Sequence, residues 1–99
     1  MSFLRKLFGL GLKVDCHELI ANGAILIDVR TPGEYSNGKP NNSKNIPLDK
    51  IGGEIENIKK LNKTVVLVCQ SGMRSGRATS MLKNRGVEAY NGGGWHNFA

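Results

Sequence analysis

The chain has 99 residues, which is enough for one compact domain but too few for two domains of ordinary size. The hydrophobic fraction of 39% and the charged fraction of 22% are typical of a soluble globular protein, and no apolar run is long enough to insert stably in a membrane. A net charge of +6 favours anionic ligands or acidic protein surfaces. Nucleic acid is not expected as a partner, because the lysines are scattered without a dense basic run.

Residues 1–12 form an apolar and basic segment that precedes the expected domain, residues 13–99. Its uncharged run is short, is interrupted by glycine and has no small-residue cleavage pattern, so we expect a cytoplasmic protein. The segment is expected to pack on the domain or on another copy of it, and a weak amphipathic contact with a membrane surface is the alternative. The two cysteines, Cys16 and Cys69, are expected to be reduced thiols.

The first elements of the domain are predicted to be a short helix and a buried strand. Asp15, with Glu18 three residues later, fits a capping box at the start of the helix, and Asn22 followed by glycine predicts its end. Residues 24–29 are nearly all apolar, as is typical of a strand that is buried on both faces of a parallel sheet.

A second short helix is predicted directly after this strand. Thr31 is the expected N-cap, Pro32 occupies the first helical position and Glu34 the third, which is again the pattern of a capping box. Residues 38–47 are rich in asparagine and contain two prolines, so they predict an irregular loop.

The second half of the chain continues the alternation of helices and strands. Three isoleucines between residues 51 and 58 are spaced by four and three, which predicts a helix with one buried stripe. Residues 65–69 predict a second buried strand, residues 75–85 a helix and residues 87–90 a last short strand. This order predicts an α/β fold with a central, mainly parallel sheet and helices on both faces.

Cys69 is the most informative position, because it ends the second buried strand and directly precedes a turn that contains glycine. The backbone N–H groups of such a turn and of the following helix form a concave anion site that favours a thiolate. Arg74 adds a positive charge nearby. Asp28 and Arg30 lie at the end of the first strand, so we expect them at the same rim of the sheet. The residues expected to form the anion-binding loop are Gln70, Ser71, Gly72, Met73, Arg74 and Ser75.

The segment from Cys69 to Ser75 resembles the active-site loop of rhodanese-like sulfurtransferases, which is typically C-x-x-G-x-R followed by a small residue. Three other segments resemble that family in the same order, namely residues 26–35, 45–48 and 92–95. The resemblance departs from the family before Asn45, where the histidine of the usual G-H-I-x-G-A is absent. It implies a three-layer rhodanese-like fold.

The activity that the resemblance implies is sulfur transfer by covalent catalysis, with Cys69 as the nucleophile. The donor would be a small anion such as thiosulfate or a persulfide, and the acceptor would be cyanide, a thiol or a sulfur-accepting protein. A persulfide carrier without turnover, or a protein-binding module, is one alternative. A cysteine-dependent phosphatase or arsenate reductase is a weaker one, because those enzymes have five residues between cysteine and arginine, whereas this chain has four.

Several supporting residues are predicted around the loop. Arg74 either binds the donor anion or braces the loop by pairing with Asp28 or Glu34, and we expect the brace. Arg30 and Arg77 are weaker candidates for attracting the donor, and a solvated position is equally expected for each.

No cofactor or metal is predicted. His17 and His96 have no carboxylate or cysteine at metal-ligand spacing. Trp95 is expected to fill the core near the end of the chain rather than to contact substrate.

Overall fold

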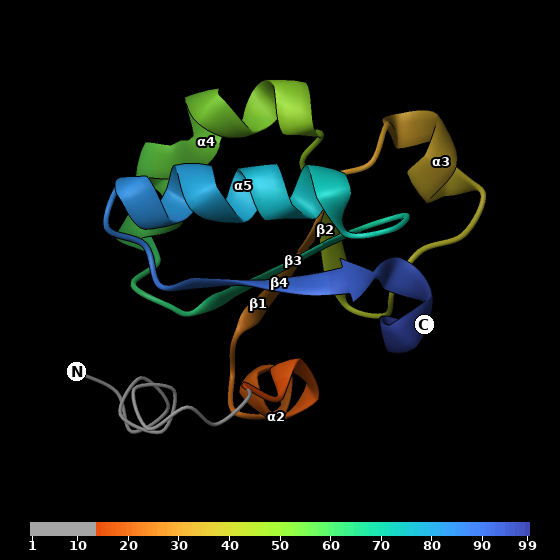
Figure 1. The fold of residues 1–99 in the computed structure, drawn as a ribbon, viewed down its shortest axis with the longest axis horizontal. Helices are drawn as coiled ribbons and strands as arrows, with labels where there is room; N and C mark the ends of the chain where they lie inside the picture. The colour runs from red at the N-terminus through yellow and green to blue at the C-terminus, as the bar shows by residue number, and fades with distance from the viewer. Residues whose placement is uncertain (1–13) are drawn as a thin grey trace.

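The computed structural model describes residues 14–99, so the predicted segment of residues 1–12 lies outside the described residues. Four parallel strands form the centre of the fold (Figure 1). The strands lie in the order β2-β1-β3-β4, and their bounds are β1 Ile25–Asp28, β2 Ser43–Asn45, β3 Val65–Cys69 and β4 Ala89–Gly94. This order places the carboxyl ends of β1 and β3 side by side in the middle of one rim.

Helices cover both faces of this sheet (Figure 1). One face is covered by α4 (Leu48–Lys60) and α5 (Met73–Asn84), and the other by α2 (Cys16–Ala21) and the 3-10 helix η1 (Trp95–Phe98). The remaining helix, α3 (Pro32–Ser36), lies beyond the carboxyl end of β1. The predicted three-layer α/β fold is therefore confirmed.

The two faces of β3 separate the core into two apolar clusters. All five residues of β3 are buried, as the continuous apolar run predicted. Leu67 and its alternate neighbours pack with the isoleucine stripe of α4 and with α5. Val66 and Val68 pack with Leu19 of α2 on the opposite face. Both faces of the strand are thus fixed, so the position of Cys69 at its end is fixed as well.

Side-chain caps start the two short helices where the sequence predicts them. The Asp15 carboxylate accepts hydrogen bonds from the backbone N–H groups of His17 and Glu18 in the first turn of α2. Thr31 and Glu34 form the complete capping box at the start of α3. The capping box also orients the Glu34 side chain, which takes part in the site below.

Several elements differ from the prediction in their bounds. The loop predicted over residues 38–47 contains the edge strand β2, whose three polar residues carry no apolar alternation. The last strand begins at Ala89 instead of residue 87 and extends to Gly94, because pairing with β3 holds its glycines in the sheet. Helix α5 begins at Met73 rather than residue 75, directly after Gly72. None of the helices in residues 14–99 is both long and apolar enough to cross a membrane.

Candidate active site around Cys69

Cys69 is the last residue of β3, and its side chain is buried where the loop turns into α5. Its Sγ accepts a hydrogen bond from the backbone N–H of Gly72 at 3.0 Å and lies 3.4 Å from the hydroxyl oxygen of Ser75. Burial has the largest effect on the pKa of Cys69 and raises it, but hydrogen bonds from Ser75, Gly72 and Ser71 together outweigh burial. The pKa of the Cys69 thiol is therefore lowered, which favours the nucleophilic thiolate.

Gly72 gives the loop its shape. It is the N-cap of α5 and has a φ of +102°, a conformation that residues with a side chain rarely adopt. A Cβ atom at this position would also lie 3.3 Å from the Cα of Gly93 in β4. The loop can therefore turn its N–H groups toward Cys69 only because residue 72 is glycine.

Arg74 braces the loop against α3. Its Nη1 and Nη2 donate to the two carboxylate oxygens of Glu34 at 2.8 and 3.1 Å, which is a bidentate pair. The hydrogen bond from Arg74 is the main cause that lowers the pKa of Glu34 to about 2. The sequence left open whether Arg74 pairs with Glu34, pairs with Asp28 or binds the donor. In the structure Glu34 is its partner.

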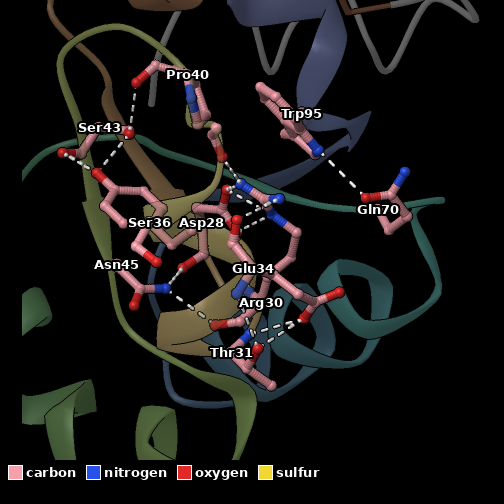
Figure 2. Close-up of polar contacts among 12 residues, drawn as sticks. Asp28, Arg30, Thr31, Glu34, Ser36, Pro40, Ser43, Asn45, Gln70 and Trp95 are labelled. Carbon is pink, nitrogen blue, oxygen red and sulfur yellow. Dashed lines mark hydrogen bonds and ion pairs between the residues drawn. The ribbon is translucent and has the colours of Figure 1, made fainter.

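Asp28 is paired with Arg30 instead (Figure 2). Asp28 is 0% exposed and Arg30 is 2% exposed, and the guanidinium nitrogens of Arg30 lie 2.7 to 3.0 Å from the carboxylate oxygens of Asp28. Arg30 also donates to the backbone carbonyls of Glu34 and Gly38 at 3.3 and 2.7 Å. The expectation that Arg30 is solvated is wrong, because this buried guanidinium holds the chain after β1. Its role in attracting the donor stays a prediction.

Trp95 lies closer to the loop than the sequence suggested. It is half-buried and packs against the apolar cluster on the α2 face, as a core residue would. Its indole N–H also donates to the side-chain oxygen of Gln70 at 3.2 Å (Figure 2), and the guanidinium carbon of Arg30 lies 4.4 Å from the centroid of its ring. Trp95 thus connects the core to the first residue of the loop.

The other predicted residues lie on the surface of this region. Gln70, Ser71 and Met73 are exposed, and the Met73 side chain is 74% exposed at the start of α5. Arg77 is exposed in the second turn of the same helix. Within residues 14–99, no group of three or more histidine, cysteine, aspartate or glutamate side chains is arranged to hold a metal ion.

Sequence reasoning missed Asn91, whose side chain contacts the loop from β4. It forms hydrogen bonds with the carbonyl of Gly72 at 2.9 Å and with the hydroxyl of Ser75 at 2.7 Å. The available signal was an asparagine directly before a run of three glycines at the end of a strand. Such an asparagine often bonds a backbone group two residues further on.

The fold and the site define a parallel α/β protein with a cysteine at the end of a central strand, whose sulfur accepts a hydrogen bond from the loop that follows. The family model described as the rhodanese-like domain matches residues 13–99. The chain therefore belongs to the rhodanese-like domain family.

Relatives and a solved structure agree with this assignment. Over 71 residues the chain is 37% identical to a tRNA sulfurtransferase of Thermoplasma acidophilum, a match that covers 72% of this chain and 14% of that protein. It is 42% identical over 69 residues to the uncharacterized protein YqhL of Bacillus subtilis, covering 69% of this chain and 54% of that one. The chain thus spans less than two thirds of either relative.

A rhodanese from E. coli, solved with anions, is similar to this chain in fold and sequence. The two structures have a TM-score of 0.69 and 32% sequence identity. The match covers 78% of this chain and 93% of the E. coli protein. The rhodanese-like form of the predicted three-layer fold is therefore confirmed.

Proposed function

We propose that the chain is a sulfurtransferase in which Cys69 carries the transferred sulfur as a persulfide. The observation that carries this proposal is the set of hydrogen-bond donors around the sulfur of Cys69, from Gly72 and Ser75. Fixed donors stabilise an anionic sulfur without having to reorganise during the reaction. The lowered pKa of the thiol fits the same role.

The chemistry divides into two displacements at sulfur. The Cys69 thiolate attacks the outer sulfur of thiosulfate, forms an S–S bond and releases sulfite, which leaves with the electron pair of the broken bond. A thiolate acceptor or cyanide then attacks the outer sulfur of the persulfide and yields a new persulfide or thiocyanate, while Cys69 departs as a thiolate. Neither step requires a proton from the protein, so anion stabilisation is the main task of the loop.

The bracing of Arg74 favours sulfur transfer over phosphoryl transfer. Both terminal nitrogens of its guanidinium donate to Glu34, so the carboxylate competes with any oxyanion for them. The loop also has four residues between Cys69 and Arg74, which suits one sulfur atom better than a tetrahedral group.

The two cysteines of the chain are free, and they differ in reactivity. Burial, with a smaller effect from the charge of Asp15, raises the pKa of Cys16, whereas the pKa of Cys69 is lowered. Cys69 is therefore the expected site of sulfur loading. Free thiols also fit the proposed cytoplasmic location.

The proposal is tested by turnover of thiosulfate and cyanide to thiocyanate and sulfite. The wild type is expected to turn over many times, and the variant Cys69→Ser is expected to lose all of this activity because it lacks the nucleophile. Cys16→Ser is the matched control and is expected to retain the activity. Thiocyanate formation by Cys69→Ser at the wild-type rate would contradict the proposal.

A persulfide carrier that serves a partner protein is the second candidate. It is favoured by Met73, whose side chain is 74% exposed beside the loop and offers an apolar contact to a protein acceptor. The same assay separates the two candidates. An enzyme makes many equivalents of thiocyanate, whereas a dedicated carrier accepts about one sulfur per chain and then stops in the absence of its partner.

A further inference from the structure

The side-chain amide of Asn91 contacts the Cys69 loop although it comes from a different strand. Its Oδ1 accepts a hydrogen bond from the hydroxyl of Ser75 at 2.7 Å and another from the backbone N–H of Gly93 at 3.0 Å. Its Nδ2 donates to the carbonyl oxygen of Gly72 at 2.9 Å. Asn91 is exposed, yet its two polar atoms are engaged with the protein at three points.

The chemistry of these partners requires an amide at this position. The backbone N–H of Gly93 can only donate, so it must meet the oxygen of the side chain. The carbonyl of Gly72 can only accept, so it must meet the nitrogen. A carboxylate of the same shape would satisfy the first contact but would place a second oxygen against the Gly72 carbonyl.

A β-bulge fixes Asn91 in this place. Leu67 of β3 pairs with Asn91 and Val68 pairs with Gly93, so Gly92 is an extra residue in β4 without a partner. A Cβ atom on Gly92 would lie 2.9 Å from the Cγ1 of Val66, so the extra residue must be glycine. The bulge lets the N–H of Gly93 bond to the Asn91 side chain two residues earlier.

We propose that Asn91 is a positioning residue for Cys69 that acts through Gly72 and Ser75, an inference that rests on the proposed role of Cys69. The carbonyl of Gly72 is held by Asn91 and by the backbone N–H of Gly76 at 2.9 Å. These two bonds to the carbonyl, from β4 and from α5, fix the backbone conformation of Gly72. The N–H of the same residue therefore stays directed at the sulfur. Asn91 thus preserves the geometry of the hydrogen bond from the Gly72 N–H to the sulfur of Cys69.

Ser75 also connects Asn91 to Cys69, but through this residue Asn91 has the opposite effect on the hydrogen bonding of the sulfur. Its hydroxyl has one hydrogen, which goes either to the Asn91 oxygen at 2.7 Å or to the sulfur of Cys69 at 3.4 Å. Removal of Asn91 would free this hydrogen for the sulfur and would offset the loss at Gly72. A test of the Gly72 connection therefore needs a protein that lacks the Ser75 hydroxyl.

Charged neighbours do not complicate such a test. Most charged side chains next to the loop are already paired, Arg74 with Glu34 and Asp28 with Arg30. The exception is Arg77 of α5, which is exposed. Strand β4 contributes no charged residue. A neutral substitution at Asn91 therefore changes the hydrogen bonds around the sulfur without changing the charge.

The experiment measures the rate at which iodoacetamide alkylates Cys69 as a function of pH, quantified on the peptide that contains Cys69. In a Ser75→Ala background, Asn91→Ala is expected to raise the pH midpoint of alkylation by about half a unit to one unit, because the Gly72 donor is no longer held. Asn41→Ala is the matched control in the same background. Asn41 is also exposed, and its backbone N–H bonds to the carbonyl of Phe98, a contact that the substitution leaves in place, so no shift is expected.

An unchanged midpoint in the double variant, with or without a loss of stability to denaturant, would overturn the inference and leave Asn91 a structural role only. If Asn91→Ala does not fold in the Ser75→Ala background, Asn91→Gln in the same background decides, since it stays neutral but its extra methylene moves the amide away from the Gly72 carbonyl. Its midpoint is also expected to rise, and no rise would overturn the inference. Alkylation needs no sulfur donor. A wild type that alkylates normally but takes no sulfur would therefore contradict only the proposed function.

Discussion

Asp28→Ala is expected to lower the free energy of unfolding by about 3–5 kcal/mol, the largest loss from any single ion pair of the described residues. The substitution leaves the side chain of Arg30, a residue that is 2% exposed, buried without its counter-charge. The burial of an unpaired charge costs more than the pair itself contributes. Denaturant titration of the purified variant measures the loss.

Two further variants make this prediction specific. Asp28→Asn keeps one acceptor oxygen for Arg30, and its loss is expected to lie between those of the wild type and Asp28→Ala. Glu56→Ala removes the partner of Arg85 in an exposed pair of 2.6 Å, and a change of at most about 1 kcal/mol is expected. Equal losses in Glu56→Ala and Asp28→Ala would show that the buried pair has no special role.

Gly72→Val is expected to reduce sulfur transfer by a factor on the order of 100, the largest loss from any substitution that keeps Cys69. Valine does not tolerate the φ of +102° at this position, so the backbone must rearrange. The rearrangement turns the N–H of residue 72 away from the sulfur, to which it donates at 3.0 Å. Turnover of thiosulfate and cyanide, with the folded fraction determined separately, measures the effect.

Gly23→Val is the matched control for this substitution. Gly23 has a φ of +105°, and a Cβ atom there would meet nothing within 4 Å. It lies in the turn between α2 and β1, at the opposite end of the sheet from Cys69. A similar backbone strain is therefore introduced without a change in the loop. Equal losses of transfer in the two variants would show that the Gly72 conformation has no special function.

The sequence predicted those parts of the fold that depend on local patterns. The capping box of Thr31 and Glu34 and the apolar run of β3 each have a cause within a few residues, and both are confirmed. The edge strand β2 could not be predicted, because its residues are polar and only pairing with β1 makes them a strand. Local sequence therefore shows where an element starts, but it does not show which neighbour completes it.

The candidate site also combines features that local sequence predicts with contacts that it does not predict. The position of Cys69 follows from a strand, a glycine and a helix that are contiguous in sequence. The choice between Asp28 and Glu34 as the partner of Arg74 does not follow in this way, because Arg74 meets Glu34 across 40 positions. The burial of Arg30 likewise depends on the chain that folds over it. Asn91 is 22 positions beyond Cys69 and reaches the loop only through the pairing of β4 with β3. Contacts of this kind require the folded structure.

The position of the transferred sulfur tests the central claim most directly. After incubation with thiosulfate and removal of the excess, peptide mass spectrometry under non-reducing conditions is expected to find one added sulfur atom on the peptide that contains Cys69. The pKa of Cys16 is raised by burial, so its peptide is expected to stay unmodified. Sulfur found on Cys16, or loading that persists in Cys69→Ser, would contradict the account.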